Sequence, residues 1–340
     1  MKYFQIKMLP TESWWEAGKV QIPTYSIIFL LGLVGNILVI LVLVKNKGMR
    51  TVTNVFLLNL AVSDILLGVL CMPFTLVGSL LKDFVFGHFM CRLIPYMQAC
   101  SVAVSGWTLV CLSVERYYAI CHPLRSRTWQ TLTHAYRLIG AIWVCSLLLM
   151  TPISVLSELI PTSGGHRKCR ELWPNEDIEK TYNLLLDFLL LVIPLIVMVT
   201  TYTLVAKTLW RVMKTQKPGN KMGLKDNRVT WKQNSRGSPH LRRSNTEKAL
   251  KKKKRVVKML FAVVLEFFVC WTPLYVINTI TLFAPQAVYE RLGYKGISFL
   301  QLLAYSSSCC NPITYCFMNS SFRRAFLKLF GCLREEKGSS

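Results

Sequence analysis

Seven long apolar stretches are the feature that most constrains how this chain can fold. Each can cross the roughly 30 Å hydrocarbon core of a membrane, and lipid offers backbone amides no hydrogen-bond partner, so each must be a helix. A chain of 340 residues that is 52% hydrophobic is also too apolar for a soluble domain. The sequence therefore predicts an all-α fold, a bundle of seven transmembrane helices. The predicted spans are 25–44, 54–81, 88–120, 135–160, 181–209, 256–283 and 296–318.

The net charge of +24 is distributed unevenly between the two sides of this predicted bundle. If the loops alternate, 11 Lys and Arg lie on the N-terminal side and the other 30 of 41 lie on the opposite side. Because membrane proteins keep their excess of Lys and Arg in the cytoplasm, we expect an extracellular N-terminus and a cytoplasmic C-terminus in the plasma membrane. The same distribution favours anionic membrane lipid over nucleic acid as the partner of the basic residues.

Three parts follow along the chain: an extracellular segment 1–24, the bundle 25–318 with a basic cytoplasmic loop at about 211–250, and a cytoplasmic tail 319–340. The first part lacks the order of a signal peptide, so the first helix is expected to direct insertion. At the start of the tail, apolar and basic residues alternate with helical spacing. This pattern predicts a short amphipathic helix on the inner leaflet. Cys332 just beyond it is a candidate palmitoylation site.

Only two of the twelve cysteines, Cys91 and Cys169, fall at predicted extracellular positions. Disulfides form in oxidising compartments, so the pair predicts a bridge between the third helix and the loop after the fourth. The alternative is two free thiols, which would leave that long loop unanchored.

Glu115-Arg116-Tyr117 stands at the predicted cytoplasmic end of the third span. An ionised side chain in the bilayer costs roughly 2.5–3.5 kcal/mol on insertion scales, so the pair is expected to have a function. Arg116 follows Cys91 by 25 residues, about 37 Å of helix, which places the two at opposite faces of the membrane. This geometry suggests a lock on one side and a tether on the other.

Polar residues are also predicted inside the membrane. Asp64 lies midway along the second span, where an uncompensated carboxylate is costly. Such a cluster predicts either a water-filled cavity able to hold an allosteric sodium ion or a purely structural hydrogen-bond network, and the sequence leaves both open. The candidate neighbours of Asp64 at suitable depth are Asn36, Ser105, Ser307, Ser308 and Asn311. Two further acids, Asp187 and Glu266, receive no role from the sequence.

Prolines are predicted inside four of the spanning helices, with Pro152 in the fourth and Pro194 in the fifth. Pro273 follows Trp271, with Phe267 one turn earlier, and Pro312 follows Asn311. A proline removes a backbone hydrogen bond and kinks the helix, which creates a point where its halves can swing. Together with Glu115-Arg116, these kinks predict a two-state switch.

Several motifs are absent from the sequence. No HExxH, GxSxG, P-loop or clustered metal-ligand pattern occurs, so we expect no enzyme and no cofactor apart from the sodium ion. No ring of charge or carbonyl filter typical of an ion channel is visible. A seven-helix transporter or channel nevertheless stays open as an alternative, because Asp64, Asp187 and Glu266 could line a polar path.

Taken together, these residues resemble the rhodopsin-like (class A) G-protein-coupled receptors. The matching signatures are Gly35-Asn36, Leu60-Ala61-x-x-Asp64, Cys91 with Cys169, Glu115-Arg116-Tyr117, Trp143, Cys270-Trp271-x-Pro273 and Asn311-Pro312-x-x-Tyr315. The resemblance implies a heterotrimeric G protein as partner, of the Gq type, with arrestin and receptor kinases.

A mechanism is also implied by this resemblance. When ligand binds outside, the sixth helix pivots at Pro273 and Arg116 is released from Glu115. Arg116 can then meet Tyr202 and Tyr315, which opens a cytoplasmic cleft for the G protein. Nucleotide chemistry belongs to the G protein.

Finer matches resemble the cholecystokinin/gastrin receptors and, most closely, their arthropod relatives, the sulfakinin receptors. The former are matched by residues 50–54, 81–87, 123–131 and 311–319, and the latter by 168–174 and 305–310. The implied ligand is a short peptide with a sulfated tyrosine, an acidic residue and an amidated C-terminal phenylalanine. A receptor for a different amidated peptide is the alternative.

The resemblance also implies ligand-binding residues. The basic residue after the loop cysteine contacts the sulfate, here Arg170 with Lys168 beside it, and Asn278 recognises the C-terminal part of the peptide, near Trp271. Thr281 stands where vertebrate relatives carry an arginine. Two pocket positions exclude other ligands: Gln98 replaces the aspartate of aminergic receptors, and Tyr305 replaces the retinal lysine of opsins.

Overall fold

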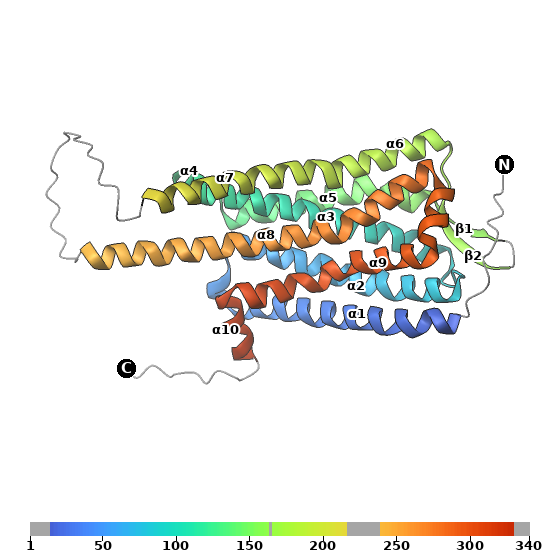
Figure 1. Cartoon of the computed structure of the whole chain (residues 1–340), viewed down its shortest axis with the longest axis horizontal. Helices are drawn as coiled ribbons and strands as arrows, with labels where there is room; N and C mark the ends of the chain where they lie inside the picture. Colours follow the sequence, from blue (N-terminus) through green and yellow to red (C-terminus); the bar gives the residue numbers. More distant parts are fainter. Residues whose placement is uncertain (1–13, 163–164, 216–238, 330–340) are drawn as a thin grey trace.

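The computed structural model describes residues 14–162, 165–215 and 239–329, and within them long helices run side by side along one axis (Figure 1). The seven predicted spans are all present, so the predicted fold class is confirmed. The long helices are α1 (Trp14–Lys45), α2 (Val52–Leu81), α3 (Gly87–Cys121), α5 (Leu132–Leu156), α6 (Glu176–Asp187) continued by the π-helical η2 (Phe188–Val192) and α7 (Ile193–Thr215), α8 (Pro239–Phe283) and α9 (Pro285–Met318). The short elements are η1 (Lys47–Met49), α4 (Pro123–Trp129), β1 (Ser157–Pro161), β2 (Arg167–Glu171) and α10 (Ser320–Leu329).

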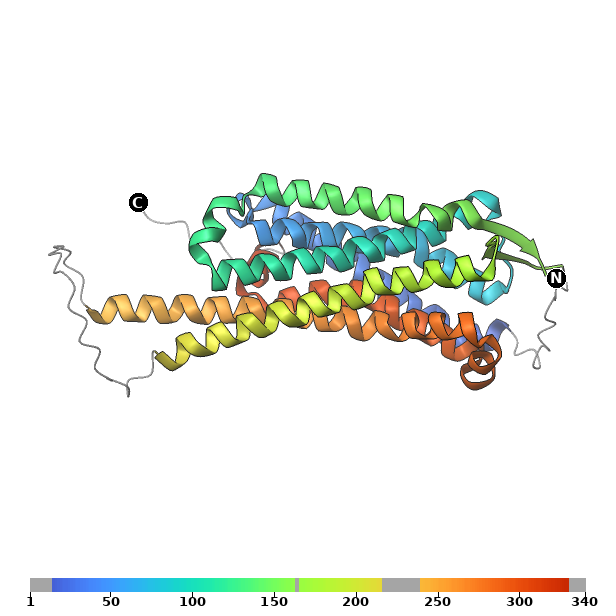
Figure 2. The ribbon, with the colours of Figure 1, turned by 90° about the horizontal axis from the view of Figure 1, so that it is seen from above.

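Strands β1 and β2 form an antiparallel hairpin at one end of the bundle (Figure 1). At the opposite end, α10 turns away from the axis of the bundle. We call these the hairpin end and the α10 end. Seen from above, α7 and α8 project past the other helices at the α10 end (Figure 2). The middle of the predicted basic loop (216–238), residues 1–13 and Cys332 lie outside the described residues.

Six of the seven described spans are long and apolar enough to cross a membrane by length and composition alone, and α9 is the exception. Its polar residues face inward, since Tyr305, Ser307 and Ser308 are all buried. Helix α9 packs against α1, α2 and α8. The seventh span is therefore accounted for by packing within the bundle and not by hydropathy alone.

Local sequence explains several helix ends. Thr51 precedes α2 and accepts a hydrogen bond from the Asn54 backbone N–H at 3.3 Å, and Thr131 caps α5 in the same way through His134. Such side-chain caps satisfy donors that have no partner in the first turn. At the far end of α2, Lys82 adopts a left-handed conformation (φ 52°), which stops the helix.

The predicted end of the fourth span was wrong. It was expected to continue to 160, but α5 ends at Leu156 and the following residues form β1. Residues Leu159 and Ile160 prolong the apolar run, so hydropathy alone could not show the end. Strand pairing decides it, because Leu159 lies opposite Cys169 in β2. Other helices exceed the predicted spans, since α1 begins at Trp14 and α8 at Pro239.

Two contacts draw distant helices together. A Cβ added to Gly35 in α1 would stand 2.9 Å from Cβ of Pro312 in α9, so only glycine allows this approach. The Asn59 amide of α2 donates to Thr108 of α3 at 2.8 Å and accepts from Trp143 of α5 at 2.9 Å. These contacts fix the mutual depth of five helices around the interior polar residues.

The helix predicted after residue 318 is present as α10. Its Phe322 is fully buried and packs on the Tyr315 ring of α9, with centroids 5.7 Å apart. Two exposed arginines, Arg323 and Arg324, follow on its outer face. The position of this helix on the inner leaflet stays a prediction.

Candidate functional site

A disulfide ties the hairpin to the bundle. Cys91 near the start of α3 and Cys169 in β2 are bonded, with Cα atoms 5.5 Å apart, as the sequence predicted. A second tie comes from Asp83, whose Oδ1 accepts from the Arg167 backbone N–H at 2.6 Å and lies 3.9 Å from its guanidinium Nε. The hairpin is thereby held to α3 through the disulfide and to the end of α2 through Asp83.

Lys168 and Arg170 lie on the face of β2 opposite to Cys169, because successive side chains of a strand alternate. Both are exposed, and no described acid lies within 4 Å of either charged group. Glu158 of β1 lies directly opposite Arg170 and is also exposed. Beside Arg170, burial raises the pKa of the Glu171 carboxyl, which the Trp173 indole N–H and the charge of Arg170 counteract. The Arg170 guanidinium is therefore exposed, with Glu158 and Glu171 as neighbouring acids.

Gln98 and Tyr305 meet between α3 and α9. The Tyr305 hydroxyl donates to Gln98 Oε1 at 2.9 Å and lies 2.9 Å from Thr75 Oγ1 of α2. The Tyr305 side chain is fully buried, and Gln98 is half-buried. These two predicted pocket residues therefore form one hydrogen-bonded layer across three helices.

Trp271 and Asn278 are two turns apart on α8, and this spacing of seven residues puts them on one face. The Trp271 indole N–H donates to Ser307 Oγ of α9 at 2.9 Å, and the ring is buried near Phe267, with centroids 6.4 Å apart. Asn278 is exposed toward the hairpin end. Asn278 thus lies on this face near the hairpin end, and Trp271 lies deeper in the bundle. Thr281 follows one turn beyond Asn278.

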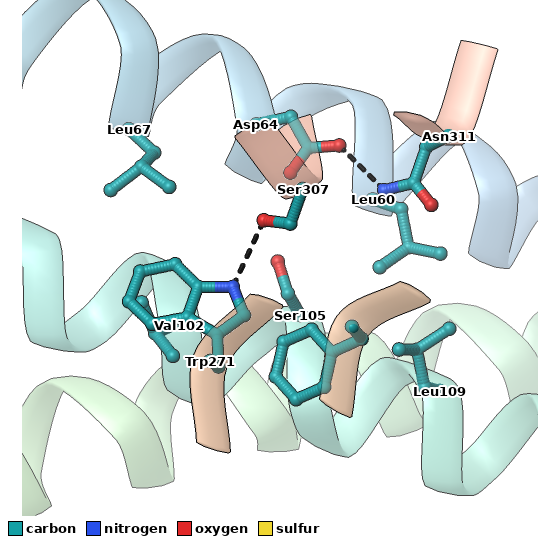
Figure 3. Close-up of a pocket in the computed structure, with 10 residues that line it drawn as sticks. Leu60, Asp64, Leu67, Val102, Ser105, Leu109, Trp271, Ser307 and Asn311 are labelled. Carbon is teal, nitrogen blue, oxygen red and sulfur yellow. Dashed lines mark hydrogen bonds between the residues drawn. The ribbon is translucent and has the colours of Figure 1, made fainter. Parts of the chain in front are cut away.

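A small cavity lies beside Trp271, lined by Asp64, Ser105, Ser307 and Asn311 together with Trp271 itself and apolar side chains (Figure 3). Asn311 donates to Asp64 Oδ2 at 2.9 Å. All four polar residues carry oxygen atoms, the donor type that hard cations prefer. The donor set therefore fits a sodium ion.

Ser308, the fifth predicted sodium residue, has its side chain beside Asp64, although it is not among the residues that line this cavity. Its backbone oxygen accepts from the Asn36 amide of α1 at 2.8 Å. Ser308 therefore adjoins both Asp64 and the packing of α1 against α9, and its part in a sodium site stays a prediction.

Glu115 and Arg116 are paired at the α10 end of α3. The guanidinium Nε donates to Glu115 Oε2 at 2.7 Å, a second nitrogen lies 2.5 Å from Oε1, and the guanidinium also donates to Thr53 of α2. The Gln130 side chain donates to the Glu115 backbone oxygen at 2.8 Å. Tyr117 points elsewhere, since its hydroxyl lies 3.1 Å from His122 Nε2. The Glu115–Arg116 pair expected from the sequence is thus present as an ion pair, and its role as a lock stays a prediction.

Tyr202 of α7 and Tyr315 of α9 both have buried hydroxyls that lack a hydrogen-bond partner among the described residues. Buried polar atoms are normally paired, so two unpaired hydroxyls at the same end as Arg116 require an explanation. Tyr315 follows Pro312 by three residues, on the part of α9 beyond the kink. Both side chains therefore have hydrogen-bonding capacity that the Glu115–Arg116 pair leaves unused.

Sequence reasoning left Asp187 and Glu266 without partners, and the structure supplies them. Thr279 of α8 donates to Asp187 of α6, and Thr314 of α9 donates to Glu266 of α8 at 2.6 Å. Each acid meets a threonine of a neighbouring helix. Their depth in apolar helices was the only available signal, because the partners are distant in sequence.

Known proteins resemble this chain along most of its length. The family described as "7 transmembrane receptor (rhodopsin family)" matches residues 35–315. The cholecystokinin receptor of Xenopus laevis is 40% identical over 93% of this chain and 78% of its own length. The cholecystokinin receptor type A of Homo sapiens is 41% identical over 95% and 82%, and the gastrin/cholecystokinin type B receptor of Sus scrofa is 37% identical over 91% and 78%.

This family consists of signalling receptors of the plasma membrane that bind a ligand and activate a G protein, not of enzymes. The match favours a receptor over the transporter or channel alternative. It also agrees with the disulfide, the Glu115–Arg116 pair and the prolines inside α8 and α9 in the structure. The chain belongs to the rhodopsin family of seven-transmembrane receptors, and within it to the cholecystokinin and gastrin receptors.

Proposed function

We propose that this chain is a receptor for a sulfated, C-terminally amidated peptide of the cholecystokinin type, in particular a sulfakinin, and that it activates a Gq-type G protein. The observation that carries the peptide assignment is the hairpin, which holds Arg170 exposed and without a described ion-pair partner. In this proposal the hairpin end faces the extracellular side, an orientation that the charge distribution supports. Arrestin and receptor kinases act at the opposite end.

The peptide binds with its sulfate at the hairpin and its amidated end deeper in the bundle. Arg170 donates charge-assisted hydrogen bonds to the sulfate, with Lys168 on the same face of β2. The C-terminal part meets Asn278 on α8 and approaches the Gln98–Tyr305 layer. Thr281 offers a hydroxyl but no charge, so the acidic residue of the peptide relies on cations elsewhere.

Ligand contact at α8 is transmitted through Trp271. Its hydrogen bond to Ser307 couples α8 to α9 close to both prolines, so a displacement of Trp271 moves both kinks. Beside it, Asp64, Ser105, Ser307 and Asn311 would hold a sodium ion, which would supply a positive charge that favours the packed resting state. An Asp64→Asn variant should lose the effect of sodium concentration on peptide affinity. A sodium dependence equal to that of the unmodified receptor would contradict this site.

At the α10 end, Arg116 leaves Glu115 and forms hydrogen bonds with Tyr202 and Tyr315. This step gives partners to two hydroxyls that are buried and unpaired in the resting structure. A ligand shifts the equilibrium only by its difference in affinity for the two states, so the peptide must bind the open form more tightly.

The decisive experiment uses the purified receptor in lipid nanodiscs with heterotrimeric Gq protein. Nucleotide exchange is measured with three versions of one peptide: sulfated and amidated, unsulfated, and with a free C-terminal carboxylate. We expect exchange to be highest with the first and strongly reduced with the other two. Equal responses to all three would refute the ligand assignment, and no response to any would refute the peptide class.

A further inference from the structure

Glu266 is an acid inside a membrane-spanning helix that the proposed signal path does not use. Its Oε1 accepts a hydrogen bond of 2.6 Å from the Thr314 hydroxyl, and Thr314 is buried. Its Oε2 is buried and has no partner among the described residues. An apolar side chain would connect α8 and α9 without an unsatisfied oxygen, so packing alone does not explain a carboxyl here.

The hydrogen bond joins the segments of α8 and α9 that adjoin their internal prolines. Glu266 precedes Phe267 and comes seven residues before Pro273, and Thr314 comes two residues after Pro312. Because α8 runs toward the hairpin end and α9 runs away from it, both residues lie on the α10 side of their prolines. The bond therefore joins the two helix halves that must separate for a cleft to open at that end.

Phe267 extends the same contact to α3. Its ring lies 3.4 Å from the position that a Cβ on Gly106 would occupy. Glu266 and Phe267 thus hold α8 against α9 and α3 at one level. Thr314 is adjacent to Tyr315, so the bond also fixes the segment that carries one of the two unpaired hydroxyls.

We propose that Glu266 is a positioning residue for activation, and that its hydrogen bond with Thr314 is a clasp that holds the resting receptor closed. This inference rests on the proposed two-state function and adds a second restraint to the Glu115–Arg116 lock. The clasp favours the resting state by the free energy of a hydrogen bond that is absent from the open state. It therefore sets how much signal the receptor gives without ligand.

The test measures nucleotide exchange without peptide in nanodiscs. Glu266→Leu and Thr314→Val each remove one partner, and each should raise basal exchange about five-fold, the effect of one net hydrogen bond. The double variant should show no further increase, because the two residues act through one bond. Glu266→Gln and Thr314→Ser retain an acceptor and a donor, and they should stay close to the unmodified receptor.

Thr200→Val is the matched control. The Thr200 hydroxyl donates to Ile196 within α7 and is exposed, so its loss should leave basal exchange unchanged. The clasp is refuted if neither single variant raises basal exchange, or if the two effects multiply in the double variant. It is equally refuted if the two conservative variants activate as strongly as the others.

A second measurement does not depend on the G protein. Spin labels at Lys258 in α8 and His122 beside α3, both exposed, report the separation of these helices at the α10 end. Thr314→Val should broaden the distance distribution toward longer values, and an unchanged distribution would refute the clasp. Since neither readout uses a peptide, a wrong ligand assignment leaves both intact.

Discussion

Replacing Arg170 with glutamine removes the positive charge that is proposed to bind the sulfate of the peptide. A charge-assisted hydrogen bond contributes about 1.5–3 kcal/mol. Arg170 is exposed and faces Glu158, so the lower figure applies, which corresponds to about tenfold in affinity. We therefore expect Arg170→Gln to weaken sulfated peptide about tenfold and to leave unsulfated peptide nearly unchanged.

The assay is competition binding in nanodiscs with both peptides, repeated at low and high salt. Screening should reduce the loss at high salt, since exposed charges interact less there. Arg291→Gln is the control, because Arg291 is an exposed arginine of α9 at the same end. If Arg170→Gln leaves the ratio of the two affinities as it is in the unmodified receptor, the sulfate does not bind at Arg170.

Three further predictions follow from the same structure. Glu158→Gln removes the acid opposite Arg170 and should raise affinity for sulfated peptide a few-fold in the same assay; a fall would show that Glu158 orients Arg170 instead of competing for it. Arg116→Ala should abolish G-protein activation while peptide binding at the cell surface persists, and intact nucleotide exchange would eliminate its role as latch. Gly35→Ala places a methyl group 2.9 Å from Pro312 and should lower the melting temperature by several degrees, a cost of about 1–3 kcal/mol, as measured by thermal unfolding in nanodiscs; an unchanged melting temperature would mean that α1 and α9 separate easily.

The number of helices and the disulfide could be predicted from the sequence, because each depends on a local signal. Apolar length marks a span, and only two cysteines fall on the extracellular side of the predicted topology. The pairing of Glu115 with Arg116 was also accessible, since the two are adjacent and in costly surroundings. These features need no knowledge of which helices are neighbours.

The parts that the sequence missed depend on long-range pairing. The β1–β2 hairpin interrupts an apolar run, and its strand pairing joins residues between six and fourteen positions apart. Likewise, nothing near Glu266 indicates Thr314, which is 48 residues further along the chain.

The polarity of α9 has a consequence for biogenesis. Alone among the seven described spans, it lacks the apolar composition that would favour its transfer into lipid unaided. Asn36, Asp64 and Trp271, all from helices synthesised earlier, satisfy its polar groups. The last span therefore depends for its stability in the bilayer on contacts with α1, α2 and α8, all of which are synthesised before it.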